Sequence, residues 1–278
     1  MHRALAAAPK TDRDLEAAVA AVPLWYHSIE LSSGIVTPGW FDLRPIVDLM
    51  PWPDVRGKRC LDVGTWDGFL AFELERRGAA EVVAIDIGSH EHWDWPPVLL
   101  ARGAPQGMQE LAGREQGAGF RLAKEALGSS VEHRTMSVYD LDPETVGEFD
   151  VVTCGSLMLH LRDPLRALAR IRSVCRGVFL SAEEIDLTLS ALRPRRPALR
   201  LDGVSELFQW FIPNAVAHRR MVQASGFQLE RCSKPYAIPF GLSHTQRAVG
   251  PRGAATRAWR RTMTGGDGVP HQAVLGRV

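Results

Sequence analysis

The sequence contains few cysteines, and none of them stands in a paired motif. Its 278 residues include four, Cys60, Cys154, Cys175 and Cys232, with no C-x-x-C spacing. This scatter provides no cysteine-based zinc site and is typical of a reducing compartment, so we expect a cytoplasmic protein. Cys60 and Cys154 fall in apolar segments and are expected to be buried thiols.

Long apolar runs and a strong net charge are also missing. No run approaches the ~18 residues that a membrane span needs, and residues 1–9 are Ala-rich without the apolar core of a signal peptide. The formal net charge is +1, so no global field favours nucleic acid. The length suits one large α/β domain with additions.

The rest of the chain is organised around residues 59–70, R-C-L-D-V-G-T-W-D-G-F-L. An apolar strand runs into a loop bounded by Gly64 and Gly68, a helix follows, and a second strand, 81–85, ends at Asp86. Glycine lets the backbone approach a ligand closely, and a helix N-terminus offers N–H groups. The Asp86 carboxylate is placed to accept both ribose hydroxyls. The pattern predicts a nucleoside site, with a tight turn that binds nothing as the alternative.

The glycine loop lacks the third glycine of the dinucleotide fingerprint G-x-G-x-x-G, which disfavours NAD. L-D-V-G-x-x-x-G instead resembles the first motif of the class I S-adenosylmethionine (SAM) methyltransferases. Strand–helix alternation predicts an α/β, Rossmann-like class I methyltransferase fold, with a seven-stranded, mostly parallel sheet and an antiparallel last strand. We expect an N-terminal lid extension, 1–50, and a SAM-binding domain, 51–278, with covering insertions at about 88–117, 185–209 and 242–268.

Local patterns place the individual elements. Apolar periodicity, caps and glycine stops predict helices at 11–22, 43–50, 69–77, 118–127, 164–175 and 213–225. Short apolar segments predict strands at 24–31, 35–42, 60–63, 81–85, 131–135, 149–155, 177–181, 227–232 and 272–276.

The resemblance places the cofactor at the carboxyl ends of the strands, where open α/β sheets bind ligands. Candidate SAM-binding residues come from the glycine loop, the strand exits and one residue of the N-terminal segment. They are Trp40, Asp62, Gly64, Thr65, Trp66, Asp67, Gly68, Asp86, Ile87, Val138, Tyr139, Gly155 and Ser156.

Methyl transfer is an in-line displacement that depends chiefly on holding the reactants in place. A base is needed only where the acceptor must lose a proton, and His27, His160 and Glu183 are the candidates. His160 and Glu183 follow strands, where a structural histidine is the alternative. Tyr26, His27, Trp210 and Asn214 are expected to shape the acceptor pocket.

His90 and His92 form an H-x-H pair that suits metal ligands. No third ligand of convincing spacing follows, so we expect no metal. Trp93 or Trp95 is expected to line the rim of the adenine or substrate pocket instead.

Four blocks, 25–40, 61–68, 155–164 and 210–214, resemble a narrower family, the bacterial tRNA wobble-uridine carboxymethyl/methoxy transferases. In that family a lysine, a tyrosine and an arginine hold the extra carboxylate of a carboxylated SAM. His27, Leu159 and Gln272 stand at those places here, and none of them offers a fixed charge. We therefore expect ordinary SAM and methyl transfer.

The acceptor is expected to be a small molecule, such as a secondary metabolite. A tRNA substrate is the alternative, favoured by the resemblance and by Arg-rich stretches at 193–200 and 247–261, which otherwise form a solvated basic face. A SAM-binding protein without turnover is a third possibility. The sequence leaves the acceptor atom and the oligomeric state open.

Overall fold

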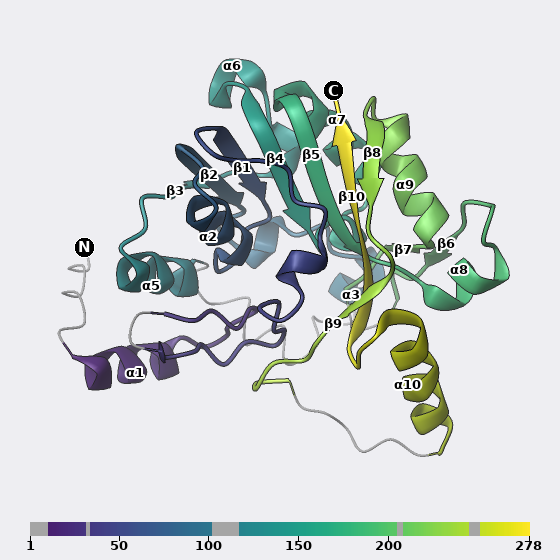
Figure 1. Cartoon of the computed structure of the whole chain (residues 1–278), viewed down its shortest axis with the longest axis horizontal. Helices are drawn as coiled ribbons and strands as arrows, with labels where there is room; N and C mark the ends of the chain where they lie inside the picture. The colour runs from purple at the N-terminus through teal and green to yellow at the C-terminus, as the bar shows by residue number, and fades with distance from the viewer. Residues whose placement is uncertain (1–10, 32–33, 102–116, 205–207, 245–250) are drawn as a thin grey trace.

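The computed structural model describes residues 11–31, 34–101, 117–204, 208–244 and 251–278. One sheet runs through it in the strand order β3-β2-β1-β4-β5-β10-β8, and β9 pairs with β10 beside this path (Figure 1). The strands are β1 (Arg59–Val63), β2 (Glu81–Asp86), β3 (Glu132–Thr135), β4 (Phe149–Gly155), β5 (Cys175–Glu184), β8 (Gln228–Cys232), β9 (Tyr236–Ile238) and β10 (Val269–Arg277).

The pairing pattern confirms the predicted fold class, although the sheet in the described residues has eight strands where seven were predicted, β9 being the additional one. β1 to β5 are parallel, and β10 runs antiparallel to both β5 and β8. A separate hairpin joins β6 (Leu199–Leu201) and β7 (Phe211–Pro213). The helices are α1 (Asp12–Ala21), α2 (Phe69–Arg76), α3 (Pro97–Ala101), α5 (Ala118–Leu127), α6 (Pro143–Val146), α7 (Pro164–Val174), α8 (Leu187–Leu192), α9 (Ala215–Ala224) and α10 (Pro251–Thr264).

Side chains alternate across the sheet and fill two cores. Cys60 and Leu180 belong to one core, which α1, α2 and α5 cover. Leu61 and Phe179 belong to the other, which α6, α7 and α9 cover. The same alternation continues to the strand exits, so it decides which residues there face a ligand site.

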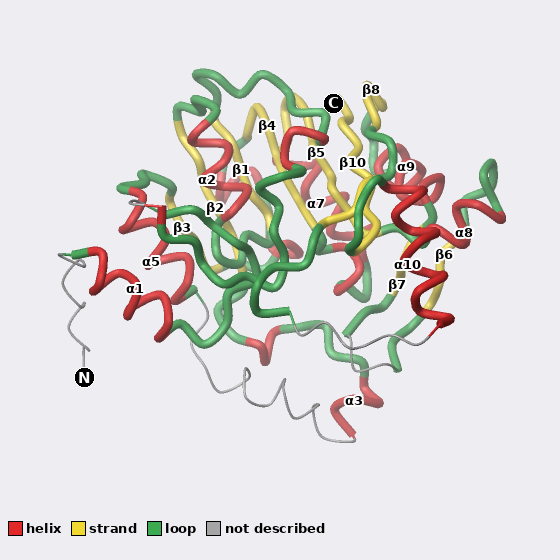
Figure 2. Tube along the Cα trace, turned by 60° about the horizontal axis from the view of Figure 1, so that its bottom comes forward, coloured by secondary structure: helices red, strands yellow, loops and turns green. Residues whose placement is uncertain are grey.

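Both ends of the chain contribute segments that cross the carboxyl ends of the parallel strands. Figure 2 turns this end of the molecule toward the viewer and shows the loops between α1 and β1 gathered there. Two strands were predicted at 24–31 and 35–42; the described residues there make isolated bridges and no strand. In the predicted helix at 43–50, Pro45 has no N–H to donate, and only a 3₁₀ turn at Val47–Leu49 forms. Within the parts that the structure describes, no helix is long and apolar enough to cross a membrane.

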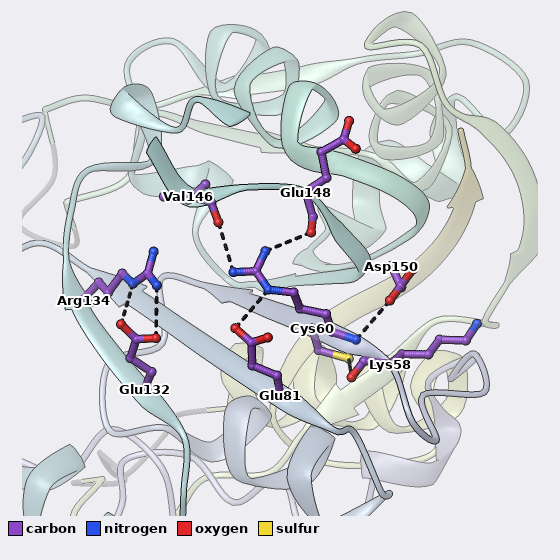
Figure 3. A network of polar contacts seen from close by, with 9 residues as sticks. Lys58, Cys60, Glu81, Glu132, Arg134, Val146, Glu148 and Asp150 are labelled. Carbon is purple, nitrogen blue, oxygen red and sulfur yellow. Dashed lines mark hydrogen bonds and ion pairs between the residues drawn. The ribbon is translucent and has the colours of Figure 1, made fainter. Parts of the chain in front are cut away.

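A polar network closes the opposite, amino end of the sheet (Figure 3). The Arg59 guanidinium donates to Glu81 Oε1 at 2.9 Å and to the carbonyls of Glu148 and Val146 at 2.9 and 3.1 Å. It also lies 4.2 Å from the centroid of the Phe149 ring. This network ties β1 to β2 and to the loop before β4.

Arg59→Ala is expected to lower the free energy of unfolding by about 2 kcal/mol, because two carbonyls and an aromatic face lose their cation. The affinity for S-adenosylhomocysteine should stay unchanged, since β1 separates this end from the strand exits by roughly 16 Å. Urea unfolding and calorimetry with S-adenosylhomocysteine check both expectations. Arg56→Ala, at an exposed pair with Asp54, should leave the unfolding midpoint where it is.

Candidate active site

Most N–H groups of the glycine loop donate hydrogen bonds to other groups of the protein. Gly64 and Thr65 donate to the carbonyl of Ile85 at 3.0 and 3.1 Å, and Gly68 donates to Thr65 at 2.8 Å. Trp66 donates to Asp86 Oδ2 at 2.7 Å. The N–H groups at these four positions are therefore bonded within the protein and are not open to a ligand.

The loop nevertheless leaves room where a ligand would approach. Gly64 has a φ of +74°, and a Cβ added there would lie 3.0 Å from the Leu157 side chain. Gly64 also lines a cavity. Another residue at this position would be strained and crowded.

Asp86 ends β2 with its carboxylate turned toward the loop. Its two oxygens accept the N–H groups of Trp66 and Ile87, at 2.7 and 2.8 Å. Burial raises the pKa of this carboxyl to about 6. Each oxygen keeps a second lone pair for a further donor.

A cavity of about 1060 Å³ runs from the glycine loop to the ends of β4 and β5 and the start of β10. Six of the predicted cofactor residues line it, namely Trp40, Asp62, Gly64, Thr65, Gly155 and Ser156. Of the predicted acceptor and catalytic residues, Tyr26, His27 and His160 line it. The remaining predicted residues are outside its lining: Trp66, Asp67, Gly68, Asp86, Ile87, Val138, Tyr139, Glu183, Trp210 and Asn214.

Asp67 fastens the N-terminal segment to the glycine loop. Its buried carboxylate accepts the N–H groups of Tyr26 and His27, at 2.8 and 2.9 Å. It also bonds His27 Nδ1. An Nδ1–H that donates to a carboxylate leaves Nε2 as the acceptor nitrogen. Asp67, predicted to touch the cofactor, holds the cover and orients His27.

The N-terminal and C-terminal segments close over the cavity together. Asp42 N–H donates to the carbonyl of Pro239 at 2.9 Å, and Gly241 N–H donates to that of Trp40 at 2.7 Å. A Cβ on Gly241 would lie 2.1 Å from the Gly39 carbonyl oxygen. The covers therefore meet backbone to backbone, which fixes their spacing.

Strand alternation corrects the position of the candidate acid in β5. Glu183 points to the face covered by α7 and α9, where its carboxylate accepts the N–H of Met158 at 3.2 Å. Its neighbour Glu184 points the other way and lines the cavity. The same alternation turns Gln272 away from the cavity and His271 into it.

Two predicted substrate residues hold the scaffold instead. Asn214 caps α9 through Ala217 N–H at 2.7 Å and donates to the carbonyls of Arg193 and Arg196. Trp210 donates to the carbonyl of Asp94 at 2.6 Å. The polar groups of Asn214 and Trp210 therefore hold the described parts of residues 193–214 in place.

Tyr139, predicted to meet the nucleoside, bonds the same loop. Its hydroxyl donates to Asp94 Oδ2 at 2.6 Å and accepts the N–H of Asp163 at 3.2 Å. Val138 is buried in the core beneath α7. Tyr139 anchors the loop after β2, Val138 belongs to the core, and neither lines the cavity.

His160 reaches the cavity as part of an aromatic stack. Its ring lies 5.4 Å from Phe208 at 14°, and Phe208 lies 4.9 Å from Trp93 at 14°. His160 Nδ1 donates to the carbonyl of Phe208 at 2.6 Å. Burial lowers the pKa of His160, so the ring is neutral near pH 7. Trp93 also stacks on Trp95 at 5.4 Å, so these rings pack the loop after β2.

Among the described residues, no three His, Cys, Asp or Glu side chains gather as a metal site.

Comparison with known proteins agrees with this geometry. A family model described as a methyltransferase domain matches residues 42–231. The chain belongs to the class I SAM-dependent methyltransferases. This methyltransferase is 32% identical over 211 residues to the ubiquinone biosynthesis O-methyltransferase of Acinetobacter baylyi, and the match covers 69% of this chain and 77% of that one.

Other relatives match over shorter stretches. The ubiquinone biosynthesis O-methyltransferase of Acinetobacter baumannii (strain AYE) is 31% identical over 138 residues, 45% of this methyltransferase and 48% of the relative. The chain thus spans about half the length of that relative. The narrower likeness to the tRNA wobble-uridine enzymes stays a prediction.

A solved structure shows the same fold at low identity. The N-terminal domain of EvdMO1, in the presence of SAH and D-fucose, aligns with 96% of this methyltransferase and 97% of that domain. The TM-score is 0.52 and the identity 15%, so the likeness concerns the fold.

Proposed function

We propose that the chain transfers a methyl group from SAM to a small-molecule acceptor bound in the cavity. The observation that carries this proposal is the continuity of that cavity, from Gly64 and Thr65 to the ends of β4 and β5 and the start of β10. Its 1060 Å³ lies at the upper end of the range of about 300–1,000 Å³ for small-molecule sites. This volume suits a cofactor together with a compact acceptor.

The residues present fit SAM. Asp62 is buried at the cavity wall. Its Oδ1 accepts the Thr153 hydroxyl at 2.8 Å, and its negative charge suits the ammonium of the methionine part. Asp86 keeps lone pairs for the ribose hydroxyls. When bound, SAM supplies an electrophilic methyl group. The chain holds the reactants in line, and the N-terminal and C-terminal segments that close over the cavity exclude water.

Asp86→Asn is expected to raise the dissociation constant of S-adenosylhomocysteine by about 10- to 100-fold, because charge-assisted hydrogen bonds are lost. Titration calorimetry measures this change, and circular dichroism verifies the fold. Glu81→Gln, at the exposed start of the same strand, is the matched control and should bind normally. An Asp86→Asn protein with wild-type affinity would contradict the cofactor assignment.

The cover that contains residues 193–200 bears on the tRNA alternative. Arg200 at its end pairs with Asp186 at 3.0 Å and Asp202 at 3.6 Å. Two carboxylates of the protein therefore partly neutralise its charge. Together with the net charge of +1, this supports a small acceptor. A steep fall of tRNA binding with salt would favour the nucleic acid instead, and labelled SAM with metabolite and tRNA pools separates turnover from binding alone.

A further inference from the structure

Three side chains, at the end of β5 and near the starts of β9 and β10, form a row on the cavity wall. The strand register pairs Glu184 of β5 with His271 of β10, and His271 with Tyr236 of β9. All three residues line the cavity. Directly opposed residues on one face of a sheet hold their Cβ atoms about 4.5–5.5 Å apart. The row is therefore a compact polar wall of the cavity, with Gln209, Arg200 and Arg260 also among the lining residues.

The Tyr236 hydroxyl has no hydrogen-bond partner in the part of the chain that the structure describes. The residue is 2% exposed, and among the described residues no group hydrogen-bonds its phenol oxygen. Burial raises the pKa of Tyr236 above its ordinary value, so the group remains an O–H donor. A buried hydroxyl without a partner costs free energy. Because Tyr236 lines the cavity, a bound molecule is the natural source of that partner.

Glu184 is available as a proton acceptor. The one hydrogen bond its carboxylate receives among the described residues is a long one, 3.3 Å from Gln209 Nε2. The pKa of Glu184 is raised to about 7, chiefly by burial; Arg200 and Arg260 lower it and Asp186 raises it within that net value. Near neutral pH the carboxyl thus exchanges a proton readily.

His271, between these two residues, is already committed. Its Nδ1–H donates to the carbonyl of Val269 at 2.9 Å, and Nε2 accepts the Ser156 hydroxyl at 2.8 Å. Burial lowers the pKa of His271 to about 4. His271 therefore positions Ser156, whose φ of +51° is unusual outside glycine. The proton-accepting role in the row falls to Glu184.

We propose that the acceptor carries a hydroxyl group, which Tyr236 hydrogen-bonds and from which Glu184 takes the proton. This inference rests on the proposed function and names its acceptor class. A hydroxyl oxygen has two lone pairs, so one accepts the Tyr236 O–H while the other attacks. An amine nitrogen has a single lone pair, which the attack itself requires.

The step balances without a further reactant. The oxygen lone pair forms the bond to the methyl carbon, and the carbon–sulfur bond breaks with its electron pair going to sulfur. The hydroxyl proton moves to Glu184 and later to solvent. The products are a methyl ether and S-adenosylhomocysteine.

The test incubates the full chain with SAM bearing a heavy-carbon methyl group and a small-molecule extract of bacterial cells. Nuclear magnetic resonance then distinguishes methyl on oxygen from methyl on nitrogen, sulfur or carbon in whichever product is labelled. We expect a methyl ether. Glu184→Gln should lower kcat by about 100- to 10,000-fold, and it should remove the rise of kcat with pH through about 7, because only the ionised carboxylate accepts a proton.

Glu183→Gln is the matched control, since it changes the neighbouring acid outside the cavity, and it should keep kcat within about threefold of wild type. Tyr236→Phe should raise KM by roughly three- to tenfold through one lost hydrogen bond. Methyl on another atom, or a Glu184→Gln enzyme with the wild-type rate and pH profile, overturns the inference alone. Label transfer to nothing in the extract, despite calorimetric binding of S-adenosylhomocysteine, overturns the proposed function as well.

Discussion

Asp67→Ala is expected to release residues 25–41 from the glycine loop and to lower the free energy of unfolding by about 3 kcal/mol. The substitution removes the acceptor of two backbone N–H groups, those of Tyr26 and His27. Each such group, left without a partner where water is largely excluded, costs about 1–3 kcal/mol. The His27 ring also loses the bond that fixes its tautomer. Urea unfolding measures the loss.

Local release distinguishes this effect from general destabilisation. Limited proteolysis should cut Asp67→Ala first within residues 25–41, whereas the wild type should resist there. Both N–H groups donate to Oδ2 of Asp67, so the amide oxygen of Asp67→Asn can accept both, and this variant should lose less stability than Asp67→Ala. Asp54→Ala removes an exposed carboxylate and serves as the control, with an unchanged midpoint. Equal protease resistance in Asp67→Ala and wild type would show that Asp67 does not hold the cover.

The parallel half of the sheet follows directly from the sequence. Apolar strands before Gly64 and Gly155, a helix after each, and an acid at position 86 specify β1 to β5, because each local pattern agrees with the global fold. The predicted antiparallel partner of β8 is likewise confirmed. The cap of α1 by Thr11 and the proline start of α7 agree with the helix signals.

The covers were harder to predict because they have little regular structure. Residues 24–42 are held by contacts with Asp67 and with the C-terminal segment, far away along the chain. α10 falls in a Gly- and Arg-rich stretch that predicted an irregular insertion. No local pattern encodes such long-range contacts.

The row of Glu184, His271 and Tyr236 shows where the prediction from local pattern was wrong by one position. The pair at positions 183 and 184 has identical side chains, and only the register with β10 decides which of them faces the cavity. A strand pattern counted from Val178 and Leu180 inward would have chosen Glu184, since alternate residues share a face. Tyr236 and His271 carried no motif, and their role depends on the pairing of β9 with β10.

Glu183→Gln is expected to stabilise the protein above pH 8 and to flatten the dependence of its stability on pH. Glu183 is 2% exposed, and burial raises the pKa of its carboxyl from 4.5 to about 8. A raised folded-state pKa means that the folded chain keeps a proton that the unfolded chain releases. The stability this provides is complete below about pH 4.5 and is lost as the pH rises through about 8.

At about 1.4 kcal/mol per pKa unit, the loss amounts to roughly 3–5 kcal/mol, and glutamine, which does not ionise, avoids it. Unfolding free energies measured in urea from pH 5 to pH 9 should therefore fall steeply for the wild type and less for the variant. The two curves should converge at the acidic end, where both side chains are neutral. Glu16→Gln, on the exposed face of α1, should follow the wild-type curve. Parallel curves for wild type and Glu183→Gln would mean that Glu183 is already ionised in the folded chain. The N–H groups of the loop after β4 would then stabilise its negative charge.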